Sequence, residues 1–185
     1  MTVTTLGEIA DWGSGGTPKR SNPAYFGVGT PWLSIADLND GYVSAAKESL
    51  TKLGIANSSA KVVPKGTLLI AMYGSIGKLG IAEVELCTSQ AIAHAKPKAD
   101  KVLVRYLFHF LLSQRHLLIQ KGRGGTQMNI GQADLKSWRI DLPTLDEQLE
   151  IVSKLDKVIV LKEAHEAQVS RLAELYQSLQ TKFMG

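Results

Sequence analysis

The pattern of hydrophobic and polar residues divides the chain into two parts. Up to Pro143, short apolar runs alternate with glycine-rich and polar stretches, which is typical of a mixed domain of strands and helices. From Thr144 to Met184 there is neither proline nor glycine, and apolar residues recur at steps of three and four. This spacing predicts one amphipathic helix, which at ~1.5 Å per residue is a rod about 60 Å long. One small domain does not need such a rod to close its core, so we expect the helix to bind a partner.

Several segments of the first part have the patterns of particular elements. The continuous apolar run Thr67–Met72 predicts a buried strand, and Gly74 and Gly77 predict a tight turn after it. Thr144 is placed to cap the long helix, with Asp146 and Glu147 in its first turn. We expect a short helix or strand at 6–11, strands at 31–35, 79–82 and 90–95, helices at 49–57 and 101–120, irregular loops at 13–20 and 121–130, and an extended segment at 138–143.

These elements predict a mixed α/β (α+β) fold for residues 1–143, followed by a long helix over residues 144–185. An apolar content of 44% and a mean hydropathy near zero are those of an ordinary globular protein. Residues 1–9 lack the pattern of a signal peptide, and the most apolar stretch is interrupted by Arg105 and His109, so we expect a cytoplasmic protein without a membrane segment. One cysteine, Cys87, and four widely separated histidines predict neither a disulfide nor a metal site.

Charge is distributed unevenly between the two parts. Residues 1–143 hold 16 Lys and Arg against 10 Asp and Glu, a net +6, whereas residues 144–185 hold 5 against 7, a net −2. An excess of positive charge on a globular domain favours a polyanion such as nucleic acid, although many proteins of this charge bind none.

The glycine-rich loops carry the side chains that we consider for nucleic-acid binding. Arg, Gln and Asn have the donors and acceptors that read base edges, and aromatic rings stack on bases. The alternative is that these are ordinary solvated loops, with the glycines serving tight turns. The candidate DNA contacts are Lys19, Arg20, Tyr25, Tyr73, Ser75, Lys78, Arg123, Gln127 and Asn129.

Patterns that would indicate catalysis are incomplete. Gly74–Lys78 follows an apolar strand, but the phosphate-loop pattern needs glycine where Met72 stands and Ser or Thr where Leu79 stands. Ser75 lacks the Gly-x-Ser-x-Gly context, and Cys87 has no histidine near it in the sequence. We therefore expect no catalytic residue, no cofactor and no metal.

Taken in order, the motifs of this chain resemble the specificity subunit of type I restriction-modification systems. The resemblance covers essentially the whole chain and rests on Gly15–Pro18 with Tyr25–Gly27, Pro31–Ser34 with Asp37–Leu38, Val63–Lys78, Ser89–Ile92, Gly125–Ile130 and Leu142–Val152. It implies a target recognition domain at 1–143 and a helix at 144–185 that spaces it from a second recognition domain. It also implies that Ser89, Gln90 and the glycine-rich motifs serve the fold rather than base reading.

The resemblance further implies a role and partners. Such a subunit catalyses nothing itself; it binds double-stranded DNA at a bipartite site and positions methylation subunits and, through them, restriction subunits. A usual member carries two recognition units in one chain, whereas this chain resembles a half-length form. We therefore expect a homodimer in which two copies supply the two recognition domains at opposite ends of the rod, reading an inverted repeat.

Two identical helices are expected to pair antiparallel about a dyad near Ala164. This register sets Lys162 opposite Glu166 and Lys154 opposite Glu174, although it also sets Lys157 opposite Arg171. The residues expected at the dimer contact are Leu149, Val152, Leu155, Ile159, Lys162, Glu166, Val169, Leu172, Tyr176 and Leu179. Two other classes stay open: a non-catalytic coiled-coil interaction module that binds no DNA, and an enzyme acting on nucleotides.

Overall fold

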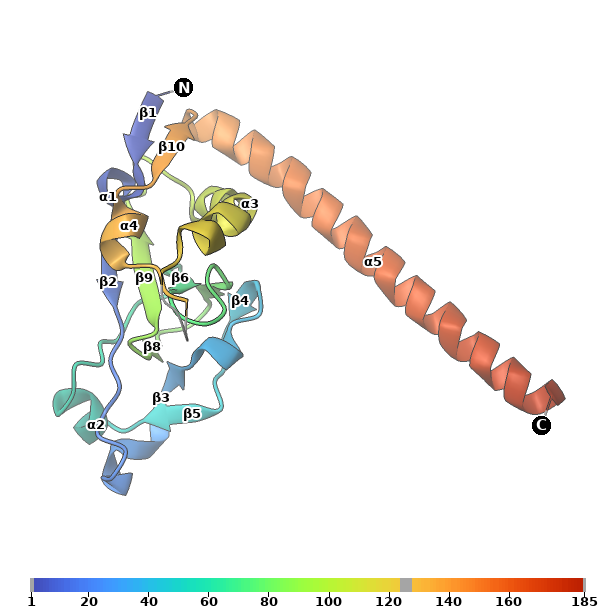
Figure 1. Ribbon diagram of the computed structural model, residues 1–185, viewed down its shortest axis with the longest axis horizontal. Coiled ribbons are helices and arrows are strands. Elements are labelled where there is room, and N and C mark those ends of the chain that lie inside the picture. Colours follow the sequence, from blue (N-terminus) through green and yellow to red (C-terminus); the bar gives the residue numbers. More distant parts are fainter. Residues whose placement is uncertain (1, 124–127, 185) are drawn as a thin grey trace.

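The computed structural model describes residues 2–123 and 128–184 and consists of a head and one projecting helix (Figure 1). The strands are β1 Thr2–Thr5, β2 Ala10–Ser14, β3 Phe26–Leu33, β4 Gly41–Val43, β5 Glu48–Leu50, β6 Leu68–Ala71, β7 Leu79–Ala82, β8 Cys87–Thr88, β9 Ile92–Pro97 and β10 Arg139–Leu142. The helices are α1 Leu6–Ile9, η1 Pro23–Tyr25, η2 Ile35–Asp37, α2 Lys52–Ala56, α3 Val104–Lys121, α4 Gln132–Lys136 and α5 Leu145–Met184.

The centre of the head is a five-stranded sheet in the order β2-β9-β6-β7-β4. Its middle strand, β6, is buried on both faces, which explains the continuous apolar run in the sequence. Leu68 and Ile70 belong to one core cluster, which also includes residues of α1, α3 and α4, whereas Leu69 and Ala71 belong to a second cluster on the other face. A three-stranded sheet, β5-β3-β8, and the pair β1-β10 complete the head.

The predicted elements are confirmed in type, but some of their bounds were wrong. The expected helix at 49–57 is shorter, because Ser49 and Leu50 pair with β3 as part of β5 and α2 begins only at Lys52. The glycine-rich segment expected to be irregular from residue 13 instead continues β2 through Ser14, where Gly13 pairs with His94 of β9. The strand expected at 90–95 lies at 92–97.

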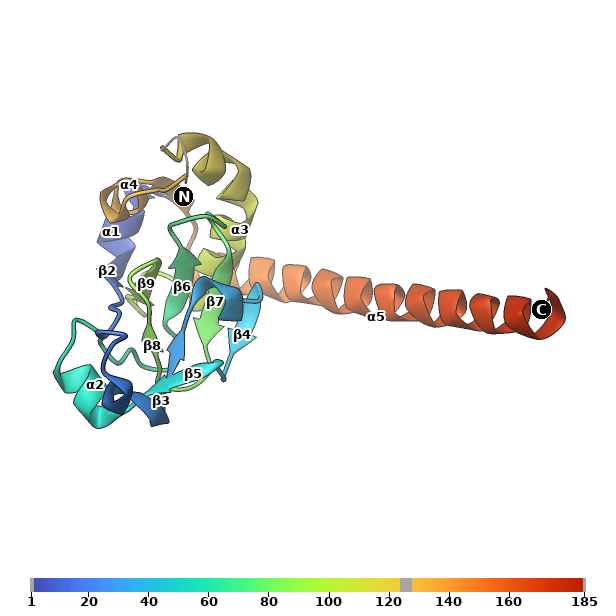
Figure 2. The same cartoon turned by 60° about the horizontal axis from the view of Figure 1, so that its bottom comes forward.

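The long helix begins with the predicted cap. The backbone N–H of Glu147 donates to Oγ1 of Thr144 at 3.4 Å, and the Glu147 carboxylate accepts from the backbone N–H of Thr144 at 2.8 Å. These two bonds form a capping box, and the hydrogen bonds from Thr144 hold the pKa of Glu147 below its ordinary value. Beyond its first turns the helix stands clear of the head, as both ribbon views show (Figure 2).

A buried glutamine fixes the start of α5 to the head. Gln148 is fully buried; its Nε2 donates to the carbonyls of Lys101 at 2.9 Å and Pro143 at 3.0 Å, and its Oε1 accepts from the N–H of Leu103 at 2.9 Å. All three partners lie in backbone that no regular element satisfies, just before α3 or just before α5. A buried amide that is fully bonded in this way specifies one arrangement of the two segments.

We expect Gln148→Leu to lower the free energy of unfolding by about 2–3 kcal/mol, because one buried N–H and two carbonyls would lose their partner. Urea denaturation at one fixed protein concentration measures this loss. The matched control, Gln168→Ala on the exposed part of the same helix, should change the value by less than about 0.5 kcal/mol. Equal effects of the two substitutions would show that Gln148 does not anchor α5.

Candidate nucleic-acid interface

The strand directions collect several loops at one end of the central sheet. β9 runs antiparallel to both β2 and β6, so the end of β2, the end of β6 and the start of β9 share that end. The β6–β7 turn and the start of β4 lie there as well, since β7 is antiparallel to β6 and parallel to β4. We call this end, with residues 15–18, 39–40, 73–78 and 89–91, the loop edge.

The second glycine-rich segment joins the loop edge through backbone hydrogen bonds. Arg123 and Asn129 exchange two N–H···O bonds of 2.8 Å. The N–H of Gly74 donates to the carbonyl of Met128 at 3.2 Å, and a bridge pairs Tyr73 with Asn129. Four predicted contact residues, Tyr73, Ser75, Arg123 and Asn129, are thus brought to one place, and the first three are exposed. Gln127 lies outside the described residues.

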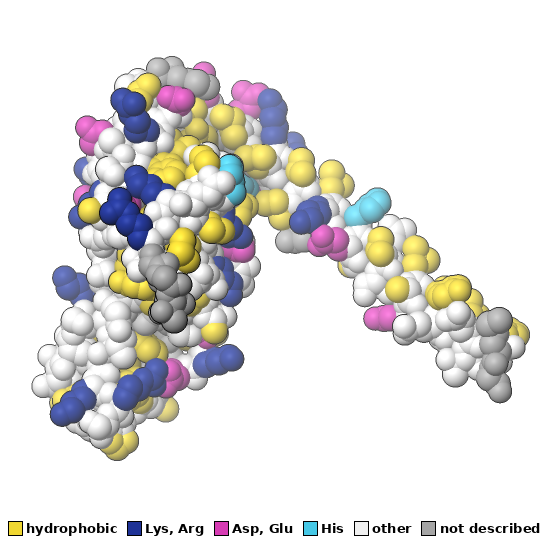
Figure 3. All heavy atoms as spheres, viewed as in Figure 1, with side chains coloured by type: hydrophobic (Ala, Val, Ile, Leu, Met, Phe, Trp, Pro, Cys, Tyr) yellow, Lys and Arg dark blue, Asp and Glu magenta, His cyan; other side chains and the backbone are white. Residues whose placement is uncertain are grey.

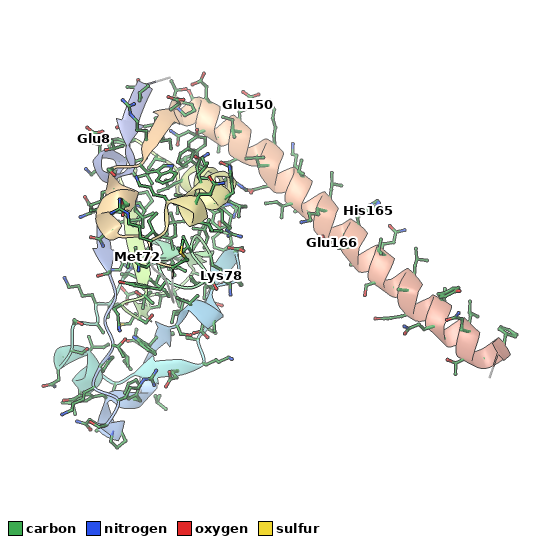
Figure 4. All side chains as sticks on the ribbon, in the orientation of Figure 1. Glu8, Met72, Lys78, Glu150, His165 and Glu166 are labelled. Atoms are coloured by element: carbon green, nitrogen blue, oxygen red, sulfur yellow. The ribbon has the colours of Figure 1, made fainter. Side chains whose placement is uncertain are left out.

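Lys78 belongs to the loop edge, and its side chain is only half exposed. Figure 4 shows that this edge lies about midway along the length of the head. Its Nζ donates to the carbonyl of Ile35 at 3.4 Å, so the side chain supports the neighbouring loop. Lys78, which the sequence predicts as a DNA contact, therefore also forms a contact within the head.

Arg115 of α3, which the sequence did not single out, holds the β6–β7 turn in place. Its Nε donates to the carbonyl of Gly77 at 2.9 Å, and its two terminal nitrogens pair with the Asp40 carboxylate at 2.5 and 3.1 Å. Asp40 in turn accepts from the N–H of Leu79 at 2.8 Å. Gly77 has φ +78°, and a Cβ there would lie 3.1 Å from Arg115 Cγ, so the turn requires glycine. Only the fold brings Arg115 to this turn, 38 residues away.

The glycines of the first loop serve close packing. Gly15 is buried, and a Cβ built on it would lie 2.0 Å from the carbonyl oxygen of Thr88. The carbonyl of the next residue, Gly16, accepts from Trp32 Nε1 at 2.9 Å. Gly15 and Gly16 therefore lie in close contact with neighbouring segments of the head, which explains why this loop requires glycine at these positions.

The segment with Lys19, Arg20 and Tyr25 leads into β3, and β3 and β5 lie at the far end of the head from β1 and β10 (Figure 1). Arg20 binds the Glu48 carboxylate through two nitrogens at 2.5 and 2.8 Å, and its guanidinium lies 4.7 Å from the Phe26 ring centroid. The hydrogen bond from Arg20 lowers the pKa of Glu48, so the pair is charged at neutral pH. Arg20 therefore has a structural partner, whereas Lys19 is exposed and has no ion pair among the described residues.

The described part of the chain shows no metal-binding cluster, a buried thiol and no membrane-spanning helix. Residues 2–123 and 128–184 contain no cluster of His, Cys, Asp and Glu that could hold a metal ion. Cys87 is buried, and burial raises the pKa of its thiol to about 11, which makes it a poor nucleophile. None of the described helices combines the length and apolar character needed to cross a bilayer.

Two different stripes of α5 have different surroundings. The first stripe faces the head of the same chain. On it, Val152 is buried and Ile159 is half-buried. Both residues were expected at the dimer contact. Lys162 and Glu166, also expected at the dimer contact, continue this stripe and pair with each other along the helix at 3.6 Å. Figure 4 places Glu166 on the side turned toward the head and His165 on the other side.

The second stripe is exposed over its whole length, and we call it the open stripe. Figure 3 shows hydrophobic side chains along α5 far from the head. Its side chains follow steps of three and four, and the apolar ones are 46–75% exposed. Its members are Val158, Leu161, His165, Val169, Leu172, Tyr176, Leu179 and Phe183. Leu149 and Leu155, also expected at the dimer contact, are exposed as well.

Comparison with known proteins identifies the family of this chain, which combines a mixed head with a long helix that carries an uncovered apolar stripe. Residues 1–172 match the family described as the type I restriction modification DNA specificity domain, and the chain belongs to this family. The resemblance noted from the motifs is thereby confirmed.

Among similar proteins, the specificity subunit of the Escherichia coli type I restriction enzyme EcoR124I/EcoR124II is 29% identical over 180 residues, covering 94% of this chain and 44% of the relative. The Methanocaldococcus jannaschii MjaIX specificity subunit is 28% identical over 158 residues, covering 83% of this chain and 36% of the relative.

Solved structures give the same fold. A chain from a type I R-M system studied for its assembly and conformational transition superposes with a TM-score of 0.76 at 26% identity, covering 98% of this chain and 45% of the other. The HsdS subunit from Thermoanaerobacter tengcongensis gives a TM-score of 0.70 at 27% identity, covering 92% and 42%. The chain thus spans less than half the length of these relatives.

Proposed function

We propose that this chain is a non-catalytic, sequence-specific DNA recognition subunit of a type I restriction-modification assembly, and that two copies pair through α5 to recognise a bipartite site. The observation that carries the proposal is the combination of one family-type head with an uncovered apolar stripe on the helix that follows it. Methylation subunits, and restriction subunits through them, are the further partners that the family membership supports. Residues 1–143 would serve recognition and residues 144–185 would serve pairing.

The proposed DNA contacts centre on the loop edge. Tyr73, Ser75, Arg123 and Asn129 combine a ring, a hydroxyl, a guanidinium and an amide at one end of the sheet. Arginine and asparagine read base edges, and cations also contribute phosphate contacts that are independent of sequence. Lys19 adds an exposed cation on the segment that leads into β3.

The geometry of α5 alters the expected pairing of two copies. Because the head covers Val152 and Ile159, the partner helix would lie on the open stripe, whose midpoint falls near Ser170 rather than Ala164. Antiparallel pairing about that midpoint sets Val169 opposite Leu172 and Val158 opposite Phe183. It also removes the unfavourable approach of Lys157 to Arg171 that pairing about Ala164 would cause.

Methylome sequencing of cells that express this chain with its methylation subunits tests the function directly. We expect methylation at a palindromic motif made of two half-sites and an unread spacer, because a twofold dimer reads inverted copies of one sequence. A motif without this symmetry would contradict the homodimer. The absence of any methylated motif, with all subunits expressed, would contradict the recognition role.

Arg123→Gln should lower the dependence of DNA affinity on salt. Each lost phosphate contact reduces the slope of log K against log salt by about 1, and Arg123 is an exposed cation at the loop edge. Fluorescence anisotropy with a labelled duplex over a range of salt concentrations measures the slope. Lys154→Gln, which removes a cation paired with Glu150 on α5, is the control and should leave it unchanged. If the wild-type chain binds no duplex with or without methylation subunits, the interaction-module alternative is favoured.

Leu172→Glu should weaken the homodimer at least tenfold, because it buries two carboxylates in the apolar contact. Light scattering over a concentration series measures the mass, which should approach ~40 kDa for the wild type from a chain of 20.1 kDa. Ala167→Glu adds the same charge on the opposite side of α5 and should leave the dimer intact. A wild-type chain that stays monomeric at tens of micromolar would contradict this pairing.

A further inference from the structure

The junction between α3 and α5 contains a polar cluster that neither DNA contact nor helix pairing requires. Oδ1 of Asp156 accepts hydrogen bonds from a terminal nitrogen of Arg105 and from Nε2 of His109, the latter at 2.9 Å. The His109 side chain is 7% exposed, and Arg105 also lies over the ring of Tyr42 at 5.5 Å from its centroid. One carboxylate of α5 is thus bound by two side chains of α3, and one of these also contacts β4.

Among the described residues of α5, Gln148 and Asp156 are the two whose side chains form hydrogen bonds with α3 or the segment just before it. Gln148, two turns earlier on the same side of the helix, fixes where α5 starts. One attachment point leaves a rod free to swing, whereas two points about 12 Å apart along the axis define its direction. From Lys157 onward, no described side chain of α5 forms a hydrogen bond or an ion pair with the head.

Asp156 contacts α3, and α3 also positions the loop edge. Ten residues after Arg105 on this helix, Arg115 binds Asp40 and the carbonyl of Gly77, which fixes the turn that carries Tyr73 and Ser75. The same helix therefore connects the direction of α5 to the placement of the proposed DNA contacts.

The length of α5 amplifies any change at this junction. Met184 lies 28 residues beyond Asp156, which is ~42 Å of helix. A change of about 10° in the direction of α5 displaces its far end by ~7 Å, which equals about two base pairs of DNA at ~3.4 Å each. In a dimer, the second head is attached at or beyond that distance and moves by at least as much.

We propose that Asp156, bound by Arg105 and His109, is a positioning residue that determines how strictly the dimer requires one separation between its two half-sites. The inference rests on the proposed function, in which two heads bind one DNA molecule through paired α5 helices. Helix length fixes the average separation, and the Asp156 cluster fixes how narrowly that separation is enforced.

The test compares Asp156→Ala with Glu150→Ala, a matched loss of a carboxylate on α5 whose partner, Lys154, belongs to the same helix. Duplexes carry the two half-sites at the preferred spacing or at one base pair more or less, and a further duplex carries a single half-site. We expect the wild type and Glu150→Ala to lose about tenfold in affinity on a one-base-pair change of spacing. Asp156→Ala should lose less than threefold, with unchanged affinity for the single half-site.

The distance between a label on the head and a label on α5 reports the direction of the helix in the absence of DNA. Nitroxide labels at Ser44→Cys and Ser170→Cys, both exposed positions, join the head to α5, while the native Cys87 is buried. Labelled chains are mixed with an excess of unlabelled chains so that each dimer carries one pair of labels. Asp156→Ala should broaden the distance distribution, and Asp156→Asn, which keeps an oxygen acceptor, should restore part of the wild-type width.

The outcomes separate this inference from the function on which it rests. A wild-type chain without any spacing preference contradicts the proposed bipartite recognition and this inference with it. A wild type with a sharp preference that Asp156→Ala retains, together with an unchanged distance distribution, overturns only the role of Asp156. Equal losses on paired and single half-sites would indicate damage to the head and would likewise overturn it.

Discussion

The docking of the first turns of α5 onto α3 is the contact on which the arrangement of this molecule depends. The head has a closed core of its own, and the rest of α5 is exposed. Besides the buried Val152, the groups that join them are polar: the buried amide of Gln148 and the carboxylate of Asp156. Burial acts to raise the pKa of Asp156, but the hydrogen bonds from Arg105 and His109 outweigh it, so the pKa lies below its ordinary value. The carboxylate is therefore charged at neutral pH. Apolar contacts tolerate sliding, whereas this bonded set permits one geometry.

The elements of the head could be predicted where local pattern decides them. The run at β6, the turn after it and the cap at Thr144 depend on neighbouring residues, and the structure confirms all three. The bounds of β5 and α2 could not be predicted in this way, because Ser49 and Leu50 join a strand only by pairing with β3. Propensity for helix was overridden there by a partner distant in sequence.

The candidate site could be predicted in composition but not in arrangement. Polar and basic residues in glycine-rich segments were found from the sequence, yet the two segments have different roles. Gly15 permits a close crossing with Thr88, whereas the second segment pairs with Tyr73 and brings Arg123 to the loop edge. Arg115 and Asp156 carried no local signal at all, since the partners of Arg115 are 38 and 75 residues away in the sequence and those of Asp156 are 47 and 51 residues away. Such residues become visible only when the fold brings their partners together.

The long helix illustrates a more general limit of periodicity. Steps of three and four along α5 identify apolar residues, but a 40-residue helix can carry two stripes on different sides. The sequence combined Val152 and Ile159 with Val169 and Leu172 into one contact surface. In the structure the first pair lies against the head, while the second pair belongs to the open stripe. The helix therefore packs against its own head over its first turns and leaves an apolar stripe exposed beyond them. A rod that bound only its head could be polar after Ile159. The apolar residues that continue to Phe183 are consequently the strongest argument for a second helix.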